Sequence, residues 1–369
     1  MKNSILPKNY LKYLQLSQLF STKRTREILS VNPTAPSERV DTQRTEISVF
    51  SYNPSFLEEK KHQDLKELLA YQQKNRIVWI NIDGIKKSEI EEVCQLFSIH
   101  ALLLEDILSI GQRPKTDEVE GVLYCLLNML YFNEEKKTVE TEQVSIVLGS
   151  NFVISFQEDA TRDVFNPIRQ RLKSIKSQVR QRTADYLLYS MIDLIVDNYF
   201  LVMEKLGEQI ELLEEEVAKK SNKRSLARIN QLRKELIVLK RNIAPVRDLV
   251  GSVIRSESEL LEDRTTKYFK DVYDHITQAF DLSENYRDVM MSIQDLYLSN
   301  VNLKMNEAMK IMAVVTSLLA PATVIGGIFG MNFDIIPISH HPKGFYIAIA
   351  MMVFSPLLML SWFRRKGLL

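Results

Sequence analysis

The 369-residue chain lacks the features that mark several common classes of protein. Its two cysteines, Cys94 and Cys125, cannot form a disulfide framework and lack the CxxC spacing of a structural zinc site, so we expect both to fill core positions. Neither sign of charge dominates, since 48 Lys and Arg stand against 47 Asp and Glu. Without a dense basic stripe we expect no nucleic-acid partner. The chain contains no phosphate-binding loop, nucleophile elbow or HExxH motif, which argues against an enzyme.

The first 40 residues have neither a helical period nor a continuous apolar stretch. Scattered Lys, Arg, Ser and Pro predict a loosely ordered tail. The missing apolar stretch argues against a cleaved signal peptide, so we expect the body of the protein to lie in the cytosol.

Charge is almost absent from the C-terminal part of the chain. Beyond Lys310 the only charged residues are Asp334, Lys343, Arg364, Arg365 and Lys366. The stretches Ile311–Gly330 and Gly344–Phe363 contain 20 residues each and no charge. At 1.5 Å per residue each helix would cover roughly 30 Å, the hydrocarbon thickness of a bilayer. We therefore predict two transmembrane helices rather than two core helices.

The flanks of these stretches predict their orientation. Lys304 and Lys310 precede the first stretch and a basic group follows the second, whereas the connection 331–343 holds one Lys and one Asp. By the positive-inside rule, both termini lie in the cytoplasm and the connection lies outside. The expected location is a multi-pass protein of the plasma membrane, with the lipid bilayer as a partner.

A stripe of small or polar residues follows the first stretch at steps of three and four residues. Its members are Asn306, Met309, Ala313, Thr316, Ala320, Thr323 and Gly327. Such a stripe serves close helix packing, or it lines a pore on the axis of an oligomer. Two helices cannot enclose a water-filled path, so a pore would require several copies of the chain.

The body before these stretches begins with mixed strands and helices. Strand-like runs at 46–52 and 77–83 flank a helical pattern from about Phe56 to Gln72. A further run starts at Val122, and VSIVL, a turn at Gly149 and FVISF then predict a hairpin. This combination is typical of an α/β domain.

The rest of the body is helical in pattern. An antiparallel pair is expected from Asp185 to Lys220 and from Arg224 to Gly251. No strong breaker separates Lys267 from Pro321, so one helix of roughly 100 Å is expected from Asp263 to Phe329.

The chain is thus expected to combine a cytoplasmic α/β domain with a long helical stalk and two C-terminal membrane helices. The predicted divisions are the tail (1–40), the α/β domain (41–180), the helical hairpin (181–262), the stalk (263–310), the first membrane helix (311–330), the external loop (331–343), the second membrane helix (344–363) and the basic C-terminus (364–369).

The first membrane stretch ends in the tripeptide Gly330-Met331-Asn332 and is preceded by NEAMKIMAVVTSLLAPATVIGGIFG. This combination resembles the CorA family of magnesium transporters, whose signature is GMN at this place. Further matching segments are LLLEDILSIGQRPK, ADYLLYSMIDLIVDNYF and YFKDVYDHI. The resemblance covers nearly the whole chain after the N-terminal tail.

The resemblance implies a homopentamer in which the stalks form a funnel, the first membrane helix lines the pore and the second forms an outer ring. It places Gly330, Met331 and Asn332 at the external mouth as the ion-selecting element. It implies that the pore and its gate are lined by Asn306, Met309, Met312, Thr316, Ala320 and Thr323. It also matches a regulatory Mg²⁺ site between subunits to Asp106 and, from the next subunit, Asp271.

The expected function is a channel-like influx of hydrated Mg²⁺ that stops when cytosolic Mg²⁺ binds between the subunits. A span without a carboxylate cannot offset the cost of stripping water from Mg²⁺, which fits a hydrated ion. Transport of Co²⁺, Ni²⁺ or Zn²⁺ is an alternative, and Co²⁺ is expected as a second cargo. A membrane-anchored metal-sensing scaffold is a third hypothesis.

The external loop departs from the pattern of the family. An acidic residue often follows the proline of this loop, whereas Ile338 follows Pro337 here, and His340 and His341 stand nearby. This departure leaves the order of cation preference open.

Overall fold

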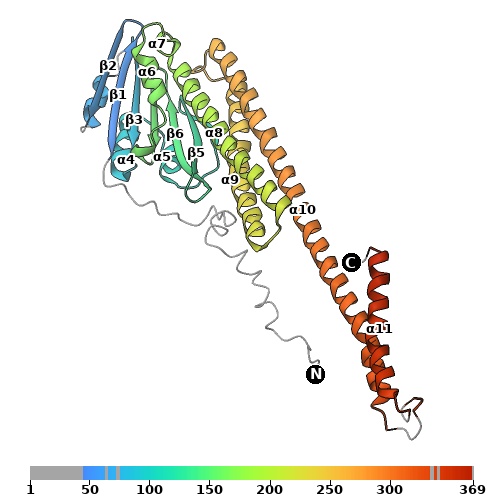
Figure 1. Ribbon diagram of the computed structural model, residues 1–369. Coiled ribbons are helices and arrows are strands. Elements are labelled where there is room, and N and C mark those ends of the chain that lie inside the picture. Colours follow the sequence, from blue (N-terminus) through green and yellow to red (C-terminus); the bar gives the residue numbers. More distant parts are fainter. Residues whose placement is uncertain (1–44, 63–64, 72–74, 333–335, 339–340, 368–369) are drawn as a thin grey trace, which may run out of the picture. The chain divides into compact units, whose positions relative to one another are not determined.

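The structure of the protein is a computed structural model that describes residues 45–332, 336–338 and 341–367, except 63–64 and 72–74 (Figure 1). The predicted tail at 1–40, and with it Asp334 and His340, lies outside the described residues. The chain divides into two compact units. The first ends at Glu216 and resumes over Asn222–Ile293, and the second joins Val217–Ser221 to Gln294–Leu369.

The first unit contains one seven-stranded sheet of order β2-β1-β3-β7-β6-β5-β4. Only β3 and β7 run parallel, and all other neighbouring strands are antiparallel. The strands are β1 (Glu46–Asn53), β2 (Phe56–His62), β3 (Ile77–Asp83), β4 (Lys115–Val119), β5 (Val122–Asn133), β6 (Thr138–Leu148) and β7 (Phe152–Gln157). The predicted strands at 46–52 and 77–83 and the hairpin around Gly149 are confirmed.

The central strands are covered on both faces. The six residues of β7, FVISFQ, are all buried, as expected for a strand in the middle of a sheet. On one face, the strands pack against the 3-10 helix η1 (Leu65–Tyr71), α4 (Lys87–Leu96) and α5 (Ala101–Leu108). Cys94 of α4 and Cys125 of β5 are buried, which confirms that both cysteines fill core positions.

An aromatic cluster marks the other face. The ring of Trp79 stacks on Phe50 with centroids 4.8 Å apart and meets Phe165 edge-on at 6.0 Å. Its indole Nε1 donates to Ser155 Oγ at 2.9 Å, so the polar end of the buried ring has a partner. Three short helices follow β7: η2 (Ala160–Arg162), α6 (Asn166–Lys173) and α7 (Gln178–Gln181).

The predicted helix from Phe56 to Gln72 is wrong. The segment begins with the edge strand β2 and continues into η1. The Oδ1 atom of Asn53 accepts from the backbone N–H of Ser55 and Phe56, at 3.0 and 2.8 Å, and this turn reverses the chain into a hairpin. The sequence FLEEKKH of β2 lacks the alternation of apolar and polar residues that is typical of strands, because an edge strand needs no apolar outer face.

The antiparallel helix pair is α8 (Ala184–Lys219) and α9 (Lys223–Arg255), which confirms the predicted helices to within a few residues. Asn222 caps α9, since its side chain accepts from the backbone N–H of Arg224 and Ser225. Tyr199 of α8 donates to the carbonyl oxygen of Asn128 at 2.6 Å, which ties the pair to β5.

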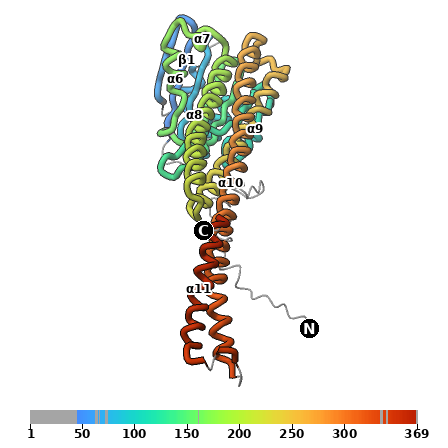
Figure 2. The backbone as a smooth tube through the Cα atoms, turned by 45° about the vertical axis from the view of Figure 1, so that its right-hand side comes forward, coloured from blue at the N-terminus to red at the C-terminus, as the bar shows by residue number. Residues whose placement is uncertain are grey.

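The long helix α10 (Asp263–Phe329) has 67 residues, as predicted, and contributes to both units. Its first part runs beside α8 and α9 in both views (Figures 1 and 2). The ion pair of Lys240 with Glu284, at 2.5 Å, joins α9 to α10. In the second unit, α11 (Gly344–Arg365) runs back along the end of α10.

Candidate functional site

Among the described residues, three helices are long and apolar enough to cross a membrane, and their burial differs sharply. The apolar window of α8 is 61% buried in the first unit, which makes α8 a core helix of that unit. The windows of α10 and α11 are only 6% and 11% buried. An apolar surface of this extent needs a membrane or further copies of the chain to cover it.

One face of α10 contacts α11. Within the first membrane stretch of α10 the less exposed residues are Val314, Ser317, Leu318, Pro321, Ala322, Ile325 and Phe329. Gly326 belongs to the same contact, because a Cβ built on it would lie 3.6 Å from the terminal methyl of Met352 in α11. On α11 the buried residues are Gly344, Ala348 and Phe363.

The predicted pore residues lie on the opposite face of α10. At about 100° per residue, the stripe from Asn306 to Gly327 is centred roughly 160° from the face that contacts α11. All six predicted pore-lining residues are exposed, and Met312, which lies on the same side of the helix, is counted with the stripe from here on: Asn306, Met309, Met312, Thr316, Ala320 and Thr323. Met309 and Met312 are 62% and 71% exposed. The stripe therefore does not serve packing between the two membrane helices of one chain.

The polar groups of this stripe are sparse. The hydroxyl of Thr323 donates to the carbonyl oxygen of Leu319 at 3.1 Å, one turn earlier on the same helix. Its oxygen remains able to accept a hydrogen bond from water. The stripe thus carries weak dipoles and thioethers, and no charge.

The predicted ion-selecting tripeptide lies where α10 ends. Gly330 donates its backbone N–H to Gly326 at 3.0 Å, and Met331 donates to Ile328 at 3.3 Å. Asn332 follows outside the helix and is exposed. Its carboxamide therefore lies beyond the end of the stripe and is exposed among the described residues.

The connection between α10 and α11 contains a local turn just before α11. His341 Nδ1 accepts from the backbone N–H of Lys343 at 3.1 Å, which is a local turn contact before α11. This contact occupies one ring nitrogen of His341.

The carboxylate of Asp106 lies on α5 and is largely covered. His100 caps the start of this helix, since its Nδ1 accepts from the backbone N–H of Leu102 at 3.1 Å. Gln143 of β6 donates its side-chain amide to the carbonyl oxygen of Asp106 at 3.2 Å, which fixes the end of the helix. Lys115 Nζ lies 2.6 Å from Asp106 Oδ2, and the Asp106 side chain is 15% exposed.

Asp271 lies on the exposed side of α10. It lines a pocket of about 400 Å³ together with Arg182, Arg264, Lys267 and Tyr268. Within the described residues, no hydrogen bond or ion pair connects Asp106 to Asp271. Their predicted pairing across a subunit boundary therefore stays a prediction.

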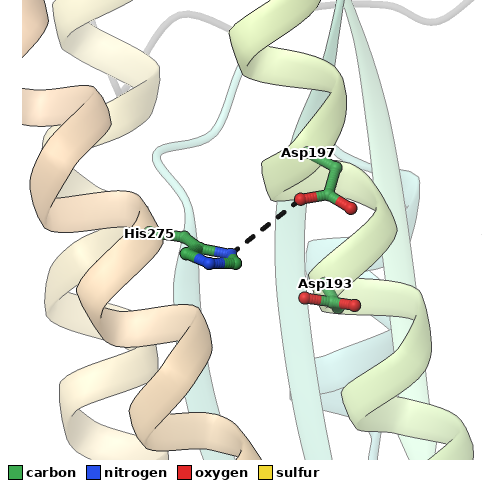
Figure 3. Close-up of side chains that lie close together, drawn as sticks. All are labelled: Asp193, Asp197 and His275. Atoms are coloured by element: carbon green, nitrogen blue, oxygen red, sulfur yellow. Dashed lines mark ion pairs between the residues drawn. The ribbon is translucent and has the colours of Figure 1, made fainter.

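A further group of metal-ligating side chains was missed in the sequence. Asp193 and Asp197 of α8 and His275 of α10 place their ligand atoms within 4.8 Å of one another (Figure 3). The two aspartates are four residues apart in MIDLIVDN, which puts them on one face of a helix. That spacing was visible in the sequence, but the approach of His275, 78 residues beyond Asp197, was not.

Comparison with known proteins gives concordant matches. Residues 74–365 match the family model described as "CorA-like Mg2+ transporter protein". The "Cobalt/magnesium transport protein CorA" of Thermotoga maritima is 38% identical over 322 residues, 87% of this chain and 92% of that protein. The protein of the same name from Methanocaldococcus jannaschii is 27% identical over 79% of this chain and 91% of its own length.

A solved structure agrees with the sequence matches. "The complete structure of CorA magnesium transporter from Methanocaldococcus jannaschii" superposes with a TM-score of 0.74 at 25% identity. The match covers 87% of this chain and 98% of that structure. The order of an α/β sheet region and long helices is therefore common to both chains.

Proposed function

The chain belongs to the family of CorA-like Mg²⁺ transporters, and from this premise we propose that it forms a homopentameric channel for hydrated Mg²⁺. Proteins of this family are membrane transporters and not enzymes. In the proposed assembly α10 lines the pore and α11 lies outside it. Both termini lie in the cytoplasm and the connection between the helices is external.

The observation that carries this proposal is the exposed stripe on α10. Its face is turned away from α11, so the stripe is available to an oligomer axis. Bulky apolar side chains such as Val315 and Leu319 flank the stripe and suit lipid or a neighbouring subunit. A stripe that faced lipid would gain nothing from its threonines, because lipid offers no hydrogen-bond partner.

The chemistry of the stripe favours an ion that keeps its water. Mg²⁺ demands octahedral oxygen ligands and gives up water reluctantly. Ile311–Gly330 contains no carboxylate that could replace that water. Five Asn332 side chains at the external mouth would form a ring of carbonyl acceptors for the protons of coordinated water. The membrane potential drives entry, because a divalent cation gains roughly 4.6 kcal/mol per 100 mV.

The proposed gate is the apolar part of the stripe. Rings of Met309 and Met312 side chains would narrow the cytoplasmic half of the pore, and a narrow apolar ring excludes water and ions. Asn306 would line the cytoplasmic end, and Thr316, Ala320 and Thr323 the wider part beyond. Separation of the helices would rehydrate the ring and open the path.

Regulation is assigned to Asp106 and Asp271 of neighbouring subunits. Two carboxylates brought together across a boundary repel each other, and Mg²⁺ between them would hold the closed state. When cytosolic Mg²⁺ falls, the closed state loses this differential stabilisation. The exposure of Asp271 supports the assignment, because the side chain is available to a neighbour.

Flux into proteoliposomes tests the pathway. With an interior-negative potential we expect uptake of Mg²⁺ that hexaamminecobalt, a mimic of the hydrated ion, inhibits. Asn332→Ala should reduce uptake at least about tenfold, which corresponds to 1.4 kcal/mol of lost binding in the pathway. Asn285→Ala, an exposed asparagine of α10 outside the membrane stretch, is the matched control. Unchanged uptake in Asn332→Ala would place the ion path away from Asn332, and an absence of uptake by the wild type would leave the anchored scaffold.

Limited proteolysis tests the regulation. Asp106→Lys combined with Asp271→Lys should abolish the protection that Mg²⁺ gives the closed state. The control pair Asp117→Lys and Asp274→Lys changes the same charge at exposed neighbouring positions. Equal Mg²⁺ protection in both double variants would remove Asp106 and Asp271 from the regulatory site.

A second form of the proposal adds Co²⁺ to the transported ions. The Thermotoga maritima and Methanocaldococcus jannaschii relatives both carry cobalt and magnesium in their names. Parallel uptake of Mg²⁺, Co²⁺, Ni²⁺ and Zn²⁺ by the same proteoliposomes decides the order of preference. A preference for Zn²⁺ or Ni²⁺ that hexaamminecobalt does not inhibit would contradict passage of a hydrated ion.

A further inference from the structure

Asp193, Asp197 and His275 form a group of convergent side chains that the proposed function does not use. Asp193 and Asp197 lie one turn apart on α8, and His275 faces them from α10 (Figure 3). All three belong to the first unit of the chain. Their ligand atoms lie within 4.8 Å of one another, and His275 Nδ1 is 4.0 Å from Asp197 Oδ1.

These three side chains, as the structure describes them, lie close together without hydrogen bonds to one another. A separation of 4.0 Å is too long for a hydrogen bond. In the part of the chain that the structure describes, neither the carboxylate of Asp197 nor the imidazole of His275 has a hydrogen-bond partner. Asp193 has one long contact, 3.5 Å from the hydroxyl of Tyr189. The lone pairs of the three groups therefore point into a common space that their own contacts do not fill.

The charge of the group favours a cation. Burial raises the pKa of Asp193, and the neighbouring charge of Asp197 raises it further. Asp271, one turn before His275, adds to the same repulsion, while His275 and Arg171 oppose it. A bound divalent ion would relieve this repulsion, because it offsets both carboxylates at once.

The spacing of the ligand atoms suits a metal ion. Ligands at about 2.1 Å from one metal are roughly 3 to 3.5 Å apart. Rotation of partly exposed side chains brings atoms that are 4.8 Å apart to this separation, since His275 and Asp197 are 39% and 57% exposed.

The donor set selects the class of metal. Mg²⁺ prefers oxygen ligands throughout and keeps several waters. Imidazole together with carboxylate suits Co²⁺, Ni²⁺ and Zn²⁺. We propose that Asp193, Asp197 and His275 bind a divalent transition-metal ion within a single chain and thereby pin α8 to α10. This site goes beyond the proposed transport of Mg²⁺, because it is complete without a second subunit and requires an imidazole.

The test uses the full chain in detergent, with Co²⁺ as the probe. X-ray absorption at the cobalt edge, at one equivalent of Co²⁺ per chain, is expected to contain the scattering pattern of one imidazole. His275→Ala should remove this pattern, and calorimetry should record a loss of Co²⁺ affinity of at least about tenfold. Asp197→Asn should weaken binding in the same direction while the chain keeps its histidine.

Two matched controls separate the site from the rest of the chain. Asp274→Asn removes one charge beside His275, and His341→Ala removes an imidazole in the loop before α11, and both should leave the cobalt signal unchanged. An imidazole pattern that persists in His275→Ala, or vanishes in His341→Ala, overturns the proposal.

A third variant separates this proposal from the proposed regulation. Asp106→Lys removes one half of the regulatory pair and leaves the three ligands intact, so Co²⁺ binding should survive while Mg²⁺ protection is lost. If Asp106→Lys keeps both the Mg²⁺ protection and the Co²⁺ binding, the result contradicts the proposed regulation and leaves the cobalt site standing. Co²⁺ binding equal in wild type, His275→Ala and Asp197→Asn would count against this site alone.

Discussion

Lys115 Nζ lies 2.6 Å from Asp106 Oδ2, so the carboxylate assigned to the regulatory site already holds a cation of its own chain. Lys115 also lies 3.5 Å from Asp117 Oδ2. Because an ammonium and a metal ion compete for the same oxygen, Mg²⁺ can bind Asp106 fully only if Lys115 shifts away. The lysine would thus set the Mg²⁺ concentration at which the transporter closes.

Lys115→Gln is therefore expected to lower the Mg²⁺ concentration that protects the closed state. The pair is partly exposed, so its loss is worth about 1 kcal/mol, or roughly fivefold in that concentration. Mg²⁺ titrations of limited proteolysis provide the measurement. Lys60→Gln, which removes a lysine paired with Glu58 on edge strand β2, is the control. A higher Mg²⁺ requirement in Lys115→Gln would mean that Lys115 supports the site and does not compete for it.

The apolar gate predicts a leak when its methionines become polar. Met309→Ser with Met312→Ser should raise uptake into proteoliposomes at saturating internal Mg²⁺, because a polar ring stays wet in the closed state. Val315→Ser is the control, since Val315 precedes Thr316 and lies about 100° around the helix from it. Equal uptake by the methionine variant and wild type under these conditions would place the gate elsewhere.

The hairpin of β6 and β7 predicts a stability effect at Gly149. A Cβ on Gly149 would lie 2.3 Å from the ring of Phe152, which is buried and packs against Phe97 at 5.1 Å. Gly149→Ala should therefore lower the free energy of unfolding of the first unit by about 1 to 3 kcal/mol. Denaturant titration followed by Trp79 fluorescence measures the change, and Ser150→Ala in the same turn should have little effect. Wild-type stability in Gly149→Ala would mean that the ring yields without cost.

The ion pair of Glu140 with Arg162 predicts a pH-dependent contribution to stability. Hydrogen bonds from Asn133 and Arg162 lower the pKa of Glu140 to about 2. A lowered folded-state pKa stabilises the fold above the ordinary pKa of 4.5, and this stabilisation is lost as the pH falls through about 2. Because the pair is partly exposed and screened, Arg162→Gln should cost about 0.5 to 1 kcal/mol at pH 7.

The measurement compares thermal unfolding at pH 7 and pH 2. The difference between wild type and Arg162→Gln should be present at pH 7 and largely gone at pH 2. Arg113→Gln removes an exposed pair with Asp248 and serves as control. If Arg162→Gln is less stable than the wild type by the same amount at both pH values, the effect comes from packing of Arg162 against Tyr131, whose ring lies 5.2 Å away.

The buried strands and the long helices could be predicted because their side chains repeat a simple pattern. β3 and β7 are nearly continuous apolar runs, and α10 has no strong breaker before Pro321. The edge strands could not be predicted in this way. β4, with the sequence KTDEV, is not apolar, and its only local signal is the turn Glu120-Gly121, where both residues have positive φ.

The features of the candidate site also differ in whether the sequence could predict them. The stripe on α10 follows from helical spacing, and the structure adds that α11 packs on the other face. The ion pair of Asp106 with Lys115 and the approach of His275 to Asp197 are contacts between elements separated in sequence. Periodicity carries no information about such contacts, because they depend on how sheet and helices are assembled.

The two outer strands of the sheet have a consequence for the proposed homopentamer. Among the described residues, β2 and β4 each pair with a strand on one side only, so they form the two edges of the sheet. Glu59, Lys60 and Lys61 are exposed on the first edge, and Asp117 and Glu118 on the second. Charged side chains on an edge strand resist addition of a foreign strand. In the proposed homopentamer, these charges would keep the sheets of neighbouring subunits from joining edge to edge.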